Sequence, residues 1–255
     1  MDKFDEIIAQ YRMVFDHHTH TVYSHGKGTI EENVRVAALK GLKSIAITDH
    51  GPGHLAFPMK MKDVEKMRAD IKAIEDKYPS VKVLLGVEAN TIRRKPYLDI
   101  SPEEGRKFDI VLAGYHFGTL GAGMTSNFVH SKTGMFGGEL SRLKAKNTAM
   151  IVDALYYNED EGNHISILTH PGDKGPFEIQ DIARACQDTG TLIEINDKHH
   201  HLTVEEIQIA SAFDVKFVIS SDAHIPERVG SFEGPLRRAL EAGLDPARIV
   251  NIEKI

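Results

Sequence analysis

Short runs of β-branched and aliphatic residues alternate along the chain with stretches of helical periodicity. The apolar runs have the length and composition of buried strands, and they span residues 13–16, 44–48, 81–87, 109–113, 165–169, 191–195 and 216–220. The stretches with apolar residues at helical spacing span residues 30–40, 62–77, 139–157, 179–188, 204–213 and 232–241. Regular alternation of strand and helix predicts an α/β fold with parallel strands and right-handed crossovers.

Such strands either roll into a barrel or open into a doubly wound sheet, and no glycine-rich dinucleotide fingerprint follows the first strand. We expect one domain over residues 1–255, because no repeat, low-complexity linker or compositional break divides the chain. The connection over residues 114–138 is glycine-rich and long enough to act as a lid over that end of the sheet.

Composition and charge exclude several classes of protein. Charged residues make up 27% of the chain and hydrophobic residues 41%, values that are ordinary for a globular protein. The net charge of −6 without a polybasic stretch argues against stable nucleic-acid or anionic-membrane binding. Cys186 stands alone, so no intrachain disulfide is expected, and its helical context predicts a buried apolar role. Without a signal peptide or membrane-spanning run, we expect a cytoplasmic protein.

Histidine changes this picture, because the chain has 14 of them and histidine is the commonest side-chain ligand for transition metals. Histidines or carboxylates stand at the ends of six predicted strands, and one more histidine lies in the loop after the first. These side chains are His18, His20, His25, His50, Glu88, His116, His170, Asp222 and His224. If the strands form a parallel barrel, the nine side chains converge on one face.

Imidazole and carboxylate donors together suit zinc, manganese or iron(II). Nine ligands exceed the roughly three or four that proteins usually supply to one such ion, so we expect two or three ions. His18 and His20 share one side of an extended segment and can reach one ion. Glu88 is the natural bridge, because the two oxygens of a carboxylate can bind different ions. Metals held in this way predict hydrolysis of a phosphoester by metal-bound hydroxide.

The motifs around these residues resemble those of the PHP family, named for polymerase and histidinol phosphatase, and especially its small stand-alone bacterial members. The resemblance spans nearly the whole chain. The matching segments are residues 16–20, His25 and residues 47–52, 86–90, 113–116, 169–172, 194–196 and 221–224. The resemblance implies a distorted TIM-like barrel of seven β/α units, with a trinuclear metal site at the C-terminal ends of the strands.

The resemblance also implies which ligands hold which of three divalent transition metal ions, with zinc expected first and manganese or iron as alternatives. The first ion would have His18, His20, Glu88 and Asp222 as ligands. The second would have Glu88, His116 and His170, and the third His25, His50 and His224. Glu88 then bridges the first two ions, and Asp222 and His224 also assist proton transfer. Glu88, Asp222 and His224 are therefore the expected catalytic residues.

The chain departs from the family pattern in two places. His17 stands where relatives usually carry an apolar residue and could compete as a ligand, although we favour His18 and His20. Residues 197–201, Asp-Lys-His-His-His, replace a smaller and less charged loop, and we expect a solvated loop with a role in substrate specificity rather than a further metal site. Lys198 and Arg228 follow late strands, and each either pairs with a substrate phosphate or remains an exposed charge.

The expected function is hydrolysis of a small phosphomonoester, either histidinol phosphate or another ester, with a small phosphorylated substrate as partner and no membrane. One alternative is an amidohydrolase-type metal hydrolase, whose barrel also begins with a His-x-His pair but commonly bridges its metals with a modified lysine. A second is a noncatalytic PHP scaffold, although such scaffolds often lose metal ligands. The retention of every matched ligand favours the phosphatase.

Overall fold

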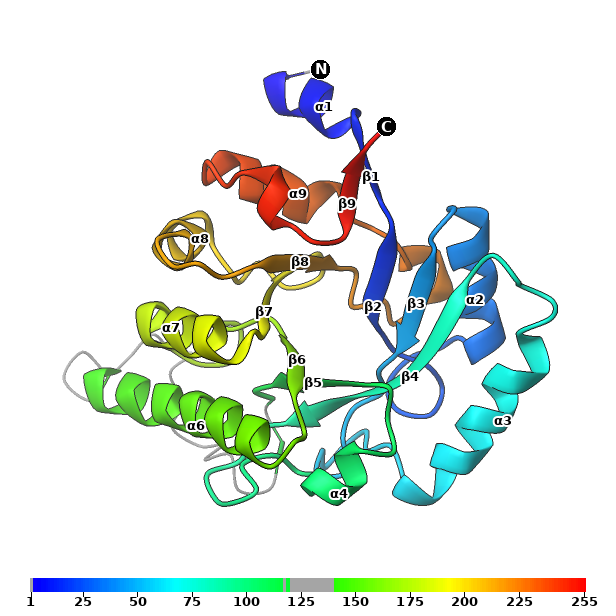
Figure 1. Cartoon of the computed structure of the whole chain (residues 1–255), viewed down its shortest axis with the longest axis horizontal. Helices are drawn as coiled ribbons and strands as arrows, with labels where there is room; N and C mark the ends of the chain where they lie inside the picture. Colours follow the sequence, from blue (N-terminus) through cyan, green and yellow to red (C-terminus); the bar gives the residue numbers. More distant parts are fainter. Residues whose placement is uncertain (1, 117, 120–139) are drawn as a thin grey trace.

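Seven parallel strands form a nearly closed barrel in the computed structural model, which describes residues 2–116, 118–119 and 140–255 (Figure 1). The strands are hydrogen-bonded to one another in chain order. They are β2 (Phe15–Thr19), β3 (Ser44–Ile47), β4 (Lys82–Asn90), β5 (Ile110–Gly114), β6 (Ile165–Leu168), β7 (Leu192–Asn196) and β8 (Phe217–Ser220). This arrangement confirms the predicted distorted barrel.

The two edge strands of the barrel, β2 and β8, meet at a seam. Thr19 forms a parallel bridge with Ala223, and the backbone N–H of His20 donates to the carbonyl of Ala223 over 2.9 Å. The seam is therefore made by residues that follow β8 and that lie next to the predicted ligands Asp222 and His224.

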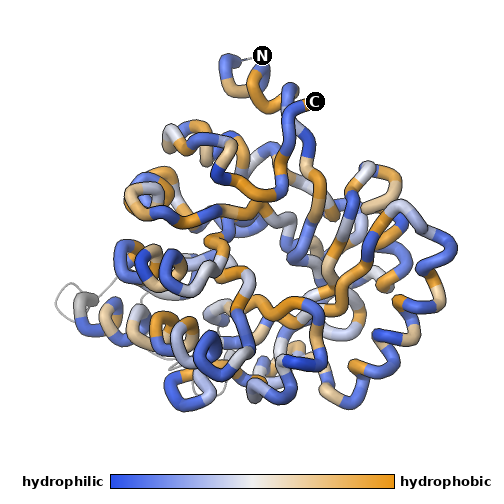
Figure 2. The backbone as a smooth tube through the Cα atoms, viewed as in Figure 1, coloured by the Kyte–Doolittle hydropathy of each residue, from blue (hydrophilic) through white to orange (hydrophobic). Residues whose placement is uncertain are grey.

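Helices surround the barrel and bury their apolar faces against its strands (Figure 1). They are α2 (Ile30–Leu39), α3 (Val64–Ile74), α4 (Pro102–Gly105), α6 (Leu140–Asp160), α7 (Ile179–Thr189), α8 (Val204–Ser211) and α9 (Glu233–Glu241), with 3-10 turns at η1 (Met61–Asp63), η2 (Pro226–Arg228) and η3 (Pro246–Arg248). Figure 2 shows hydrophobic positions concentrated on the strands and hydrophilic positions frequent on the helices and loops. Cys186 on α7 is fully buried, as predicted.

The first predicted strand, over residues 13–16, is wrong in its bounds. The chain forms two strands there, because β1 (Tyr11–Met13) pairs antiparallel with β9 (Ile252–Lys254) outside the barrel and only then does β2 begin. The helix α1 (Lys3–Ile8) precedes β1. Figure 1 shows the two ends of the chain side by side at this pair.

The inside of the barrel carries a small apolar layer of Leu112, Ile167 and Val218, which is separate from the main core between strands and helices. Glu88 pairs in register with Leu112, and Glu194 with Val218. Residues in register on neighbouring parallel strands face the same side of the sheet, so both glutamates project into the barrel.

Most of the predicted lid, residues 114–138, lies outside the described residues. Within the described part of the chain, every helix is too short or too polar to span a lipid bilayer.

Candidate metal centre

Glu88 lies at the centre of a ring of histidines at the C-terminal end of the barrel. Its side chain is fully buried, and five imidazole rings from four segments of the chain surround its two oxygens. The nearest distances are 2.9 Å for His50 Nδ1, 3.0 Å for His170 Nε2, 3.3 Å for His18 Nε2, 3.3 Å for His116 Nε2 and 3.6 Å for His20 Nε2. The structure thus brings five of the predicted histidines together around the predicted carboxylate of Glu88.

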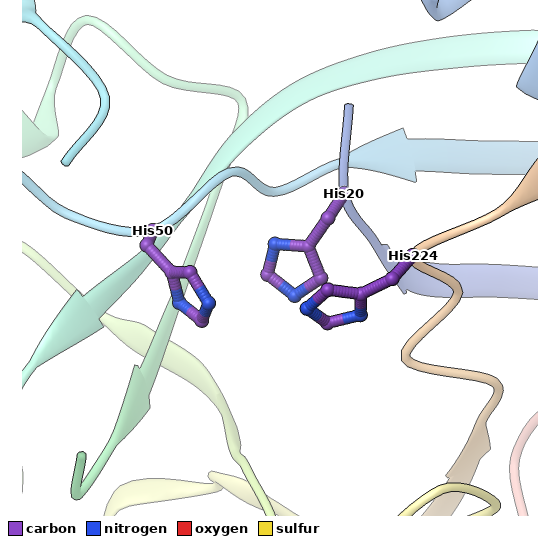
Figure 3. Close-up of side chains that lie close together, drawn as sticks. All are labelled: His20, His50 and His224. Atoms are coloured by element: carbon purple, nitrogen blue, oxygen red, sulfur yellow. The ribbon is translucent and has the colours of Figure 1, made fainter. Parts of the chain in front are cut away.

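Asp222 forms a second centre next to Glu88. Its Oδ1 lies 3.2 Å from His20 Nε2 and 3.2 Å from His224 Nδ1. Figure 3 shows the rings of His20, His50 and His224 gathered at this point, each from a different segment of the chain. Because His20 contacts both carboxylates, Glu88 and Asp222 belong to one continuous cluster.

Hydrogen bonds on the side of the rings away from Glu88 indicate which ring nitrogen of each histidine directs its lone pair at the cluster. His18 Nδ1 lies 2.7 Å from Glu194 Oε1, and His116 Nδ1 lies 2.8 Å from Asn90 Oδ1. Both partners accept, since Asn90 directs its NH₂ group at Asp99. In the neutral rings Nδ1 therefore carries the proton and Nε2 presents its lone pair to Glu88. A lone pair that faces a buried carboxylate needs a cation between the two atoms.

Some buried atoms of the cluster lie close to other ligand atoms, but for four of them no contact with a described residue has the geometry of a hydrogen bond: His20 Nδ1, His50 Nδ1, Glu88 Oε2 and Asp222 Oδ1. Buried polar atoms in folded proteins nearly always have partners, and those without one call for an ion or another explanation. All four belong to residues predicted as metal ligands. Carboxylate oxygens and imidazole nitrogens are also the donors that zinc, manganese and iron(II) accept, so the donor set fits a metal cluster.

Burial and charge keep most of the cluster in the form that binds metal. Burial lowers the pKa values of His20, His50 and His116, which favours their neutral rings. Burial alone would raise the pKa of Glu88, but the neighbouring His116 and His18 hold it well below its ordinary value. His18 differs, because the carboxylates around it, Glu194 first, outweigh burial and raise its pKa. The same carboxylates that raise the pKa of His18 would also favour a metal cation beside its ring.

Two residues of the cluster adopt backbone conformations that are uncommon for side chains other than glycine. His170 has φ of +29° and Asp222 has φ of +49°. Such conformations cost on the order of 1–3 kcal/mol each and persist where the surrounding structure imposes them, often at functional sites. Each lies two residues after the end of its strand, β6 or β8, where the turn directs its side chain to the cluster.

His25 is the predicted ligand that lies farthest from the others. Its exposed ring stacks on Phe57 with 4.0 Å between ring centroids, and it lies 4.8 Å from the ring of His224 and 6.2 Å from that of His50. In the described residues, the ligand atoms that lie within 4.8 Å of one another at this point belong to His20, His50 and His224. His25 lies beside this group without joining it.

His17 lies away from the cluster that contains His18 and His20. Its Nε2 is 2.7 Å from Ser44 Oγ, and its ring stacks on Phe15 with 4.2 Å between centroids. Burial lowers its pKa to about 4, so the ring is neutral at physiological pH.

The expectation of a solvated loop at residues 197–201 is wrong for His199. Its side chain is 17% exposed, with Nδ1 2.9 Å from Asp173 Oδ2 and Nε2 3.3 Å from Asp222 Oδ2. Together with His170 and Asp222 it forms a further group that could hold an ion. The next residue, His200, is exposed. Contact with Asp173, from the loop after β6, draws His199 inward, and the order of residues gives no sign of that contact.

Glu194 and Asn90 were matched as motif residues, but no role was predicted for either. Glu194 is fully buried. One of its oxygens contacts His18 Nδ1, and the other accepts the backbone N–H of His170 over 2.7 Å. It therefore orients two predicted ligands, as carboxylates behind metal-binding histidines commonly do. The family resemblance at residues 194–196 was the signal that pointed to it.

Two connected cavities open at this end of the barrel. One, of about 200 Å³, lies over the cluster and is lined by predicted ligands and by His54, Lys174, Lys198 and His199. Lys198 Nζ lies 3.1 Å from His224 Nδ1. Arg228, the other predicted substrate contact, is paired with Asp197 and lines the neighbouring cavity.

A parallel barrel with histidines and carboxylates converging at its strand ends defines a class of proteins, the metal-binding β/α barrels that carry their site at the C-terminal face. Within that class, the PHP domain matches residues 16–198 of this chain. The chain belongs to the PHP domain family.

Relatives and solved structures agree with this assignment. A probable phosphatase of Thermoanaerobacter sp. (strain X514) is 30% identical over 257 residues, which cover 95% of this chain and 91% of the relative. A Listeria monocytogenes structure has a TM-score of 0.63 at 16% identity, over 85% of this chain and 97% of that one. The histidinol phosphate phosphatase of Lactococcus lactis, solved with zinc, L-histidinol and phosphate, has a TM-score of 0.58 at 18% identity. The match covers 91% of this chain and 95% of that one.

Proposed function

We propose that this protein is a metal-dependent phosphoesterase that hydrolyses a small phosphomonoester at the C-terminal end of its barrel. The observation that carries the proposal is the convergence of imidazole lone pairs on the buried carboxylates of Glu88 and Asp222, with the proton of His18 fixed on the far side of its ring. Membership of the PHP family and relatives named probable phosphatases support the same chemistry.

We assign three divalent ions to the cluster, zinc first, with manganese or iron(II) as alternatives for the same donors. The proposed ligands are those of the family scheme: His18, His20, Glu88 and Asp222; Glu88, His116 and His170; and His25, His50 and His224. When bound, the metals supply a hydroxide nucleophile at neutral pH and positive charge that polarises a phosphoryl oxygen.

The protein side chains then have distinct roles in the reaction. Glu88 would be a ligand shared by two of the ions. A new bond forms from the oxygen of water to phosphorus, the ester P–O bond breaks, and the alcohol oxygen of the leaving group takes a proton. We assign that proton transfer to Asp222 and His224, which face the cavity above the cluster. Lys198 also lines this cavity, and there it can contact the phosphate.

The proposed bridge argues against the amidohydrolase alternative, since those enzymes commonly bridge their metals with a modified lysine and lack the third set of ligands, His25, His50 and His224. The noncatalytic scaffold is distinguished by experiment. Metal content per chain is measured on tag-free protein, together with hydrolysis of p-nitrophenyl phosphate before chelation, after it and after metal restoration. About three ions per chain with chelator-sensitive hydrolysis are the expected result. Absence of both metal and hydrolysis after reconstitution would establish the scaffold instead.

A further inference from the structure

A second cavity opens beside the metal centre, next to the seam between β2 and β8. Its volume is about 350 Å³, within the range of roughly 300–1,000 Å³ that is typical of small-molecule sites. This cavity shares four lining residues with the one over the cluster: His25, Lys198, Asp222 and His224. The second cavity, termed the seam pocket, is therefore a side pocket of the candidate active site.

Basic side chains from three different loops line the seam pocket: Lys27 after β2, Lys198 after β7 and Arg228 after β8. Among the described residues of the lining, Asp222 is the acidic one. It is a proposed metal ligand, so its negative charge would be balanced by the metal ions. Asp197, behind the pocket, pairs with Arg228. Even with that pair counted as neutral, the two lysines leave the pocket positively charged.

Lys27 is held in place by its backbone, although its side chain is exposed. Its N–H donates to the carbonyl of His224 over 2.8 Å. The next residue, Gly28, packs so closely on the ring of Pro226 that an added Cβ would lie 2.4 Å from it. Within the described part of the chain, the Lys27 ammonium forms no ion pair or side-chain hydrogen bond. The backbone of Lys27 is thus fixed beside the proposed site, and its ammonium is available to bind a ligand.

We propose that the seam pocket binds a second anionic group of the substrate, a carboxylate or a second phosphate carried by the leaving group. This inference rests on the proposed phosphoesterase function and narrows it. Lys198 lines both cavities and contacts the phosphate that is cleaved, whereas Lys27 and Arg228 line the seam pocket alone and contact the second anion. Ammonium and guanidinium groups form charge-assisted hydrogen bonds with such oxygens.

The same charges act against a cationic leaving group. A primary amine is protonated near neutral pH, and it would face the lysines without a carboxylate free to receive it. The preferred substrates are therefore small phosphomonoesters of acidic or phosphorylated alcohols, rather than esters of amino alcohols such as L-histidinol.

The test compares kcat/KM of the metal-loaded protein on substrates that differ in the charge of the leaving group. The carboxylate pair is 3-phosphoglycerate against glycerol 3-phosphate, and the phosphate pair is fructose 1,6-bisphosphate against fructose 6-phosphate. Histidinol phosphate and phosphoethanolamine are the cationic members. One charged contact is worth enough to favour the anionic member of at least one pair by about tenfold, and the pair with the larger ratio identifies the second anion.

The variants Lys27→Gln and Arg228→Gln should each lower that ratio several-fold, whereas Lys216→Gln, an exposed lysine at the opposite end of β8, should leave it unchanged. Ratios near one in both pairs, a preference for histidinol phosphate, or ratios that neither variant lowers would overturn the seam-pocket inference alone. Absence of hydrolysis of every phosphomonoester, p-nitrophenyl phosphate included, would overturn the proposed function itself.

Discussion

The substitution Glu194→Gln tests whether the cluster is a metal centre without touching a proposed ligand. Glu194 accepts with both oxygens: Oε1 contacts His18 Nδ1 at 2.7 Å, and Oε2 accepts from the backbone of His170 at 2.7 Å and from Asn196 Nδ2 at 2.9 Å. Glutamine has nearly the same shape but offers one oxygen and one NH₂ group. One side of the residue must then place a donor against a donor, and either His18 or His170 loses its orientation.

The expected loss of metal affinity follows from the number of ligands that Glu194 orients. Loss of a partner behind a metal-binding histidine typically lowers metal affinity by about 10- to 100-fold, which corresponds to roughly 1.4–2.7 kcal/mol of binding free energy. Because His18 and His170 are assigned to different ions and one of the two histidines loses its orientation, we expect at least one of the three binding steps to weaken. Titration of metal-free protein with Zn²⁺ against a chromophoric chelator measures each step.

A matched control is Glu206→Gln. Glu206 also contacts a histidine, with Oε2 3.1 Å from His201 Nδ1, but that pair lies outside the cluster. The affinity of the Glu206→Gln variant for Zn²⁺ should equal that of the wild type. If Glu194→Gln binds all ions within twofold of the wild type while remaining folded by circular dichroism, the histidines do not depend on Glu194 as metal ligands, and the reasoning fails.

Three further predictions concern single positions. Glu88→Gln should remove the bridge and lower hydrolysis of any phosphoester by several kcal/mol of transition-state stabilisation, at least about 100-fold, with fewer metals per chain by elemental analysis; full activity would refute the bridge. His199→Gln should lower metal retention or hydrolysis, whereas the exposed neighbour variant His200→Gln should not, and equal effects would remove His199 from the site. In metal-free protein, the pKa of His17 of about 4, below its ordinary 6.5, means that the unfolded state binds the proton first as pH falls. The free energy of unfolding should drop by up to about 3 kcal/mol between pH 6.5 and pH 4, and urea unfolding of His17→Gln should lack that part of the drop.

The strand ends were the most predictable part of the molecule. Buried strands have a strong apolar signal, and parallel strands place their C-terminal residues on one face, so the meeting of His50, Glu88 and His170 followed from order along the chain. The pairing of Tyr11–Met13 with Ile252–Lys254 was missed, because short strands from opposite ends of the chain carry little local signal.

Loop conformation was the part that order along the chain did not determine. His199 and His200 are adjacent and chemically identical, yet one faces Asp222 and the other solvent. The difference depends on Asp173, which comes from another loop. His25 shows the same limit, since its stacking on Phe57 depends on where the loop after β3 lies.

The seam between β2 and β8 has a consequence for how the protein is made. The proposed ligands at the seam come from the first and the last strand of the barrel: His18 and His20 from β2 and the residue after it, and Asp222 and His224 from the segment after β8. The N-terminal part of a chain leaves the ribosome first, so His18 and His20 emerge long before Asp222. Nascent chains therefore offer an incomplete site, and stable metal loading must wait until the last strand has left the ribosome and closed the ring. A cell that overproduces this protein should accumulate metal-free, complete barrels whenever metal supply lags behind synthesis.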